Sequence, residues 1–334
     1  MKKFKMTIAA MTAILSIVSC QKENNISVTL PDDAPLSVRL CVGGETKVTG
    51  VNPLNEKKYN SVQFFVFDAT GRLEDYKSVT GNSATLGVLA GAKTFVAVLN
   101  VGENLSDAAT LESLNAKVTK LKDNAVDHFV MVGAKEQPIS SSGASVTIPV
   151  KRLVAKITIN KITTAFESSA MMATNFKVER IYLINAAGDA HIGSSGTPTI
   201  WYNESGWHGG SASPADAADA LISDSVSLDL TGNKSNAVSH SFYCYPNSFD
   251  THNTVLELAV KIGGETDYYC IDFSTKGVGA IEPNKTYTVD ELVIKHRGND
   301  HDGDGNVEGS ASVDCTISID EWDETGLSPY TETL

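Results

Sequence analysis

The chain has 334 residues, enough for two domains of ordinary size, and a formal net charge of −13. We do not expect such an acidic chain to bind nucleic acid, whose phosphates need basic surfaces. Its five cysteines are too few and too widely spaced for a disulfide framework, and none of their spacings matches a zinc or redox motif. We expect all of them except Cys20 to be small buried residues. A bridge between Cys244 and Cys270 would require their strands to be neighbours.

Residues 1–19 have the form of a bacterial lipoprotein signal. A start with three lysines precedes an apolar run over 6–18, and the small Ser19 comes directly before Cys20. The apolar run is too short to span a bilayer easily. We therefore predict removal of 1–19 and lipidation of the Cys20 thiol, which lowers the net charge of the mature chain from −13 to −16. The alternative is an ordinary secretory signal with a chance cysteine.

The first predicted strand follows a polar tether, and together they make up 20–47. Apolar and polar residues alternate over 36–42, which is typical of a strand with one buried face. Two glycines then end the strand, and the loop 45–50 carries a single basic residue, Lys47, accessible to a trypsin-like protease. The apolar face consists of Leu36, Val38, Leu40 and Val42.

Short β-branched and aromatic runs separated by turns continue through the rest of the chain, and they indicate β-sandwiches. One helix is expected over 106–118, where Ser106 or Asp107 can cap and apolar residues recur at helical spacing. We place two domains at 48–150 and 151–298, followed by an acidic segment at 299–334. The predicted strands are 61–68, 94–99, 129–132, 146–150, 153–159, 176–184, 226–230, 240–245, 255–262, 268–273 and 287–294.

A long loop rich in small residues covers 186–219 and contains Trp201, Tyr202 and Trp207. Loops of this length are usually surface decoration. The aromatic side chains could form a platform for a ligand, but covering a sheet edge is their commoner use, which we favour.

The C-terminal segment is strongly acidic, with ten carboxylate side chains and no lysine or arginine after Arg297. A second clean alternation lies within it at 313–320 and predicts another strand with one apolar face. The start at 300–305 resembles a calcium loop, but Ala311 stands where a bidentate glutamate is needed, so a solvated acidic turn is favoured. The candidate ligands are Asp300, Asp302 and Asp304, and the apolar face is Val313, Cys315, Ile317 and Ile319.

The first and last strands each offer four apolar positions at a period of two, so either could occupy the same groove. If a protease cuts at Lys47 and the first strand leaves, it exposes an apolar slot flanked by unpaired backbone groups. The terminal strand of another subunit could fill that slot, which would join the subunits into a polymer. The alternative is that the first strand stays in place and the last strand completes its own sheet.

Several segments together resemble, in order and over nearly the whole chain, the fimbrillins of lipoprotein-derived type V pili of Gram-negative oral and gut bacteria. The resemblance implies two transthyretin-like β-sandwich domains, export as an outer-membrane lipoprotein, removal of the first strand by a surface protease, and assembly with other copies or related subunits. In that family the cut commonly follows an arginine, where this chain has Lys47; Arg39 is a disfavoured second candidate because it lies inside a strand. The matching segments are the lipobox at Cys20, 36–40 leading to 44–47, 64–68, 150–157, 242–247 and the terminal strand from Val313 to Trp322.

No sequence motif for catalysis or for a nucleotide cofactor is present, and the seven histidines are scattered. We therefore expect neither an enzyme nor a cofactor. The leading hypothesis is a polymerising fimbrial subunit that belongs to the shaft, because both terminal strands are present, and that is attached to the membrane through the precursor lipid alone. The competing hypothesis is a monomeric surface lipoprotein that binds a glycan or a host protein through the loop around Trp201 and Trp207.

Overall fold

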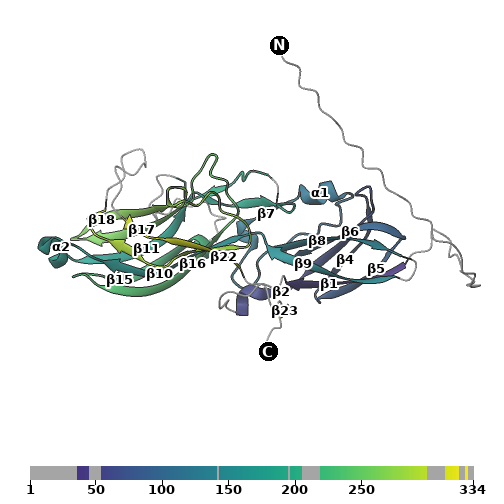
Figure 1. The fold of residues 1–334 in the computed structure, drawn as a ribbon, viewed down its shortest axis with the longest axis horizontal. Coiled ribbons are helices and arrows are strands. Elements are labelled where there is room, and N and C mark those ends of the chain that lie inside the picture. Colours follow the sequence, from purple (N-terminus) through teal and green to yellow (C-terminus); the bar gives the residue numbers. More distant parts are fainter. Residues whose placement is uncertain are drawn as a thin grey trace, which may run out of the picture.

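Two β-sandwich lobes lie side by side along the long axis of the molecule (Figure 1). The computed structural model describes residues 36–44, 54–140, 143–194, 196–204, 219–298, 313–322 and 328–329. The chain passes from the sheet of the first lobe to that of the second between Arg152 and Ala155, next to the boundary expected at 150–151. The all-β architecture predicted from the sequence is confirmed. Among the described residues, no helix is long and apolar enough to cross a membrane.

The first lobe is built on a seven-stranded sheet in the order β4-β3-β6-β8-β9-β1-β5. The strands β8 and β9 pair over two residue pairs only, so the sheet folds there into two layers. The elements of this lobe are β1 (Leu36–Gly44), η1 (Leu54–Lys57), β2 (Lys58–Tyr59), β3 (Val62–Phe67), β4 (Leu73–Val79), β5 (Ser83–Val88), β6 (Gly91–Leu99), α1 (Leu111–Asn115), β7 (Val118–Lys120), η2 (Leu121–Asp123), β8 (Met131–Ile139) and β9 (Ala144–Arg152).

The core of the first lobe lies between these two layers. Alternate residues of β3 and β6, among them Phe64 and Phe95, face Leu40 of β1, Leu86 of β5 and Ile148 of β9, and all five are at most 2% exposed. The period of two along each strand therefore places one face of every strand in this core. The opposite face of β3 is buried as well, because it packs against the core that continues into the second lobe.

The single helix expected in the first domain is present but shorter than 106–118. The helix α1 begins at Leu111, after Thr110, whose side chain accepts a hydrogen bond from the backbone of Ser113 in a capping box. Residues before it cannot join the helix because the backbone carbonyl of Ala109 accepts from the amide of Leu73 and Thr110 bridges to Arg72. Thr110 is therefore the cap, in place of Ser106 or Asp107.

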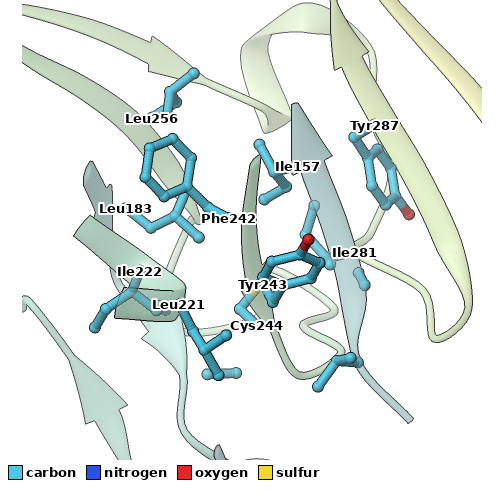
Figure 2. Close-up of a cluster of buried hydrophobic side chains, with 14 of the residues drawn as sticks. Ile157, Leu183, Leu221, Ile222, Phe242, Tyr243, Cys244, Leu256, Ile281 and Tyr287 are labelled. Atoms are coloured by element: carbon cyan, nitrogen blue, oxygen red, sulfur yellow. The ribbon is translucent and has the colours of Figure 1, made fainter. Parts of the chain in front are cut away.

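The second lobe packs a sheet built around β10 against the four-stranded sheet β15-β11-β17-β18. Figure 2 shows Phe242 of β16 reaching Leu183 of β11 and Leu256 of β17 from the opposite layer. The elements are β10 (Ala155–Thr164), α2 (Ser169–Ala173), β11 (Phe176–Ile184), β12 (Ala186–Ala187), β13 (Asp189–His191), β14 (Trp201–Tyr202), α3 (Asp219–Ile222), β15 (Ser223–Asp229), β16 (Ser235–Cys244), β17 (Val255–Ile262), β18 (Glu265–Asp272), η3 (Ser274–Lys276), β19 (Lys285–Val289), β20 (Leu292–Ile294), β21 (Val313–Asp314), β22 (Ile317–Glu321) and β23 (Ser328–Pro329).

The two lobes are joined by more than the chain between them. The strand β7 of the first lobe pairs with β13 of the second, and β2 pairs with the short strand β23 at Ser328–Pro329. The labels β7, β2 and β23 mark these pairs between the lobes in Figure 1. One apolar cluster runs from Phe65 of β3 through Phe129 to Tyr243 of β16, so the junction is part of a continuous core.

Candidate assembly site

The first strand, β1, occupies a central position in its sheet. It pairs antiparallel with β5 on one side and parallel with β9 on the other. Val38 and Leu40 are fully buried, and Leu36 and Val42 pack against the same core. The structure therefore brings together the four apolar positions that the sequence singled out, on the inward face of a strand with a neighbour on both edges.

Loss of β1 would open a slot between β5 and β9. The sides of this slot would carry apolar side chains of the flanking strands, such as Leu86 of β5 and Ile148 of β9, which lie opposite Val38 and Val42 of β1 and belong to the same core. Its two edges would be rows of unpaired backbone amides and carbonyls, which readily accept another extended segment. A strand with apolar residues at every second position is the chemical complement of such a slot.

Only one of the two candidate cleavage positions, Arg39, lies among the described residues. Lys47 lies outside the described residues, and so does Cys20. Arg39 lies within β1, where its backbone is opposite Thr85 of β5 and Ser145 of β9. Its guanidinium Nη2 donates to Ser83 Oγ at 3.5 Å. A protease needs an extended chain that is free of pairing. Arg39 therefore stays the disfavoured candidate, and cleavage at Lys47 stays a prediction.

The last strand lies at an edge of the second lobe. The strand β21 pairs with β20 and β22 pairs with β19, each on one side. Val313 is buried, whereas Cys315 and Ile317 are half-buried against the core and Ile319 is 49% exposed. In this chain the segment completes its own sheet, as the alternative interpretation of the sequence described. Its transfer to another subunit stays a prediction.

Trp322, directly after β22, is anchored far more firmly than the strand before it. Its side chain is 2% exposed and packs against both Phe129 and Tyr243, at ring-centroid distances of 5.3 and 5.6 Å. Its backbone amide donates to the carbonyl of Asn284 at 3.0 Å. The guanidinium carbon of Arg152 lies 4.4 Å from the centroid of the indole, in cation–π geometry.

A buried carboxylate, that of Glu56 in η1, completes the surroundings of Trp322. Its Oε2 accepts from the indole nitrogen of Trp322 at 3.1 Å, and its Oε1 accepts from Lys156 Nζ at 2.8 Å and from the Tyr243 hydroxyl at 2.6 Å. Arg152 Nε and Nη2 donate to its backbone carbonyl at 3.1 and 2.8 Å. Burial, together with the Glu56 carboxylate, raises the pKa of Tyr243 well above its usual range, so the hydroxyl stays protonated and donates.

The sequence patterns did not predict this cluster. Trp322 was included only as the end of the last strand, and no role was assigned to Glu56, Arg152 or Lys156. A signal was present, since three basic residues, Lys151, Arg152 and Lys156, interrupt a stretch at 150–159 whose other residues are apolar except for Thr158. Charged residues in such a stretch are rarely buried unless they are paired. The partner, however, lies in a segment about a hundred positions away along the chain.

The aromatic residues of the long loop serve packing where the structure describes them. Tyr202 is fully buried in the core, and β14 pairs with β12 in a separate two-stranded sheet. The ring of Trp201 stacks on His252 at 4.3 Å and packs against the core. Trp207 lies outside the described residues. These contacts give Trp201 and Tyr202 a role in packing and leave them little freedom to act as a ligand platform.

The four described cysteines, Cys41, Cys244, Cys270 and Cys315, form no disulfide with one another. Cys244 lies on β16 and Cys270 on β18, in different sheets, so the condition for a bridge between them is not met. The calcium candidates Asp300, Asp302 and Asp304 lie outside the described residues. Within the described ranges, no group of three or more His, Cys, Asp or Glu side chains could hold a metal ion.

The geometry defines a two-domain β-sandwich protein whose first domain is completed by its own N-terminal strand. Residues 34–199 match the family of the major fimbrial subunit protein (FimA), and residues 154–320 match the C-terminal domain of FimA-like major fimbrial subunit proteins. The chain belongs to this FimA-like family of major fimbrial subunits, which is a family of structural proteins of cell-surface fimbriae and not of enzymes.

Solved structures share the fold at low sequence identity. A candidate cell adhesion protein of Bacteroides eggerthii aligns with a TM-score of 0.69 at 18% identity, covering 86% of this chain and 96% of that one. A fimbrilin of Porphyromonas gingivalis aligns with a TM-score of 0.60 at 15% identity, covering 89% and 100%. A candidate cell adhesion protein of Parabacteroides distasonis gives 0.58 at 16% identity, covering 91% and 100%. No protein of curated function matches the chain.

Proposed function

We propose that this fimbrial subunit is made as a lipoprotein precursor and polymerises by exchange of its terminal strands. In this proposal, a lipid on Cys20 carries the precursor to the outer membrane. A trypsin-like surface protease cuts after Lys47 and releases β1 from the first lobe. The last strand of another subunit then fills the slot between β5 and β9.

The position of β1 is the observation that carries this proposal. A central strand with two neighbours and two fully buried apolar residues cannot leave without uncovering the core of its lobe. Each large apolar side chain left in water costs about 1.5–3 kcal/mol. The opened lobe is therefore unstable until another strand replaces β1, and this instability supplies the driving force for assembly.

The last strand supports the proposal through its pattern and its position. The segment 313–319 carries four apolar residues at the same period as those of β1. It is held by one neighbouring strand at a time, so it can leave its sheet by breaking a ladder on one side only. The C-terminal strand is accordingly the donor, with Val313, Cys315, Ile317 and Ile319 replacing the side chains of β1 and Trp322 following them.

A subunit with both a removable first strand and a transferable last strand can be joined at both ends. Such a subunit suits the shaft of a fimbria, because a terminal subunit needs one of these features. The partners of the chain are then other copies of itself or related fimbrial subunits, together with the maturation protease. A role in cell adhesion follows from the position of a fimbria on the cell surface.

The proposal is tested by intact mass measurement and N-terminal sequencing of the protein from the cell surface, before and after limited trypsin. We expect a mature chain that begins at Val48 and forms a ladder of oligomers that resists mild denaturant. Lys47→Gln should block both the cut and the ladder, while Lys77→Gln, at an exposed position of β4, is the control for loss of a lysine elsewhere. A chain that keeps a lipidated Cys20 and remains monomeric after cleavage would overturn the proposal and favour the surface binding module.

A further inference from the structure

The side chain of Trp322 occupies a buried site, which we name the indole socket and define by Glu56, Phe129, Arg152, Lys156 and Tyr243. Two aromatic rings pack against the indole, and the guanidinium of Arg152 lies over its face. Phe129 and Tyr243 also contact each other, at a ring-centroid distance of 4.8 Å, so the three rings form one mutually packed group. The socket joins side chains of both lobes in one cluster.

The chemistry of the socket selects an indole. A buried carboxylate oxygen, Glu56 Oε2, accepts the N–H of Trp322, and the neighbouring cation favours the electron-rich face of the ring. A phenylalanine ring would leave this oxygen without the donor that Trp322 supplies, and a buried polar atom that loses its partner is costly. Glu56 itself is fixed by Lys156 and Tyr243 through its other oxygen.

The indole socket lies directly at the end of the last strand. Trp322 directly follows β22, which has a single ladder to β19 and an exposed Ile319. Beyond Trp322, β23 pairs with β2, and β2 directly follows η1, which carries Glu56. The weakly held β22 thus ends in two contacts with the same short segment at 56–59.

We propose that the indole socket is an intramolecular latch: it holds the C-terminal strand on its own subunit, and Trp322 must leave it before that strand can enter another subunit. This inference rests on the proposed strand exchange. The latch keeps the apolar last strand from pairing with other chains before the slot between β5 and β9 has opened. It also makes departure of Trp322, rather than separation of β22 from β19, the slow step of strand release.

The latch can be measured in the uncut full-length precursor, before any assembly. Hydrogen exchange of the backbone amides of β22, followed by mass spectrometry, reports how often the strand opens. We expect Trp322→Ala to raise these exchange rates by about tenfold or more, because opening of the segment would then break one short ladder only. Ile319→Ala is the matched control on the same strand, and it should leave the rates unchanged because Ile319 is half exposed.

Assembly is then measured after trypsin, with variants on the socket side so that the donor strand itself is unaltered. Glu56→Gln should speed the appearance of oligomers about tenfold, since it removes the charge that fixes the socket. Tyr243→Phe removes one hydrogen bond while keeping both rings and all charges, and should have a smaller effect in the same direction. It is the variant to rely on if Glu56→Gln does not fold.

The outcomes separate the latch from the proposed function. Unchanged exchange in Trp322→Ala, with normal assembly of the unmodified chain, overturns the latch and leaves strand exchange standing. Faster exchange without faster assembly of either socket variant also overturns it as the slow step. A chain that is cut at Lys47 and never assembles, in any variant, overturns strand exchange itself.

Discussion

The first and last strands have the same pattern of apolar residues and opposite positions in the fold. The strand β1 is central, with ladders on both edges and two side chains that are fully buried. The strand β22 is at an edge, with one ladder and an apolar residue, Ile319, that is 49% exposed. One strand completes the core of its lobe, whereas the other covers the margin of a core that is already closed.

This difference explains why one strand would need a protease and the other would not. Departure of β1 breaks two ladders and uncovers a core, so it is not expected to occur spontaneously in a folded, uncut chain. Departure of β22 breaks one ladder and uncovers little apolar surface, so a local opening suffices. Because β22 can open locally, a separate contact is needed to keep it on its own subunit. We infer that the indole socket provides this contact.

The largest expected effect comes from truncating the inward face of β1. Leu40→Ala should lower the free energy of unfolding of the uncut chain by about 2–5 kcal/mol, because it leaves a cavity in a fully packed core. Equilibrium unfolding in urea measures this change. Ser37→Ala, on the exposed face of the same strand, is the control and should change stability by about 0.5 kcal/mol or less. Similar effects of both variants would contradict the central placement of β1.

A second prediction compares two isoleucines of the last strand in two states. In the precursor, Ile317→Ala should cost about 1 kcal/mol, because Ile317 is half-buried, and Ile319→Ala should cost less. In the fibre both side chains face the slot between β5 and β9, so both variants should weaken it comparably. Urea unfolding of the precursor and the denaturant resistance of the fibre are the two measurements. If Ile319→Ala leaves the fibre unaffected, this residue does not enter the slot.

A third, smaller effect concerns salt. The acidic last strand must approach a slot whose outward rim, where described, carries neutral residues such as Ser83, Thr85, Ser145 and Thr147. The strands β5 and β9 carry one exposed basic residue, Lys151 at the end of β9, which is too little to offset the ten carboxylates after Arg297, so added salt should speed assembly by screening repulsion between subunits. We expect an increase on the order of threefold between about 50 and about 300 mM NaCl. Rates independent of ionic strength would refute the electrostatic argument and leave strand exchange intact.

The smallest expected effects are changes in the rate at which cysteine thiols are alkylated. Each terminal strand carries one cysteine, Cys41 in the first and Cys315 in the last. Complete burial raises the pKa of Cys244 to about 12, so at about pH 8.5 roughly one thiol in three thousand is ionised. Cys244 should therefore resist alkylation in the folded chain and react once urea unfolds it. Measured against this reference by peptide mass spectrometry, Cys315 should label faster after Trp322→Ala, whereas Cys41 should not. Equal acceleration at both positions would show general unfolding rather than release of one strand.

Local patterns in the sequence identified most strands of this protein, because alternation along a strand is a property of the strand alone. The predicted runs at 61–68, 176–184 and 255–262 correspond closely to β3, β11 and β17. Among the strands of more than three residues, β4 and β5 were not predicted. A signal existed for β5, where Ala84, Leu86 and Val88 point inward. The outer strand β4 is only partly buried and mostly polar, so its sequence carries little pattern.

The features of the candidate site can likewise be divided into those that the sequence predicted and those that only the tertiary structure decided. The alternation over 36–42 and 313–320 already indicated two strands with interchangeable apolar faces. It could not say which would be central and which would lie at an edge, because a strand's neighbours come from distant parts of the chain. The socket around Trp322 depends most on such distant contacts, since Glu56 and Trp322 are 266 positions apart. Periodicity is encoded within each strand, whereas pairing, burial of charges and the anchoring of the last strand arise only when the two lobes fold together.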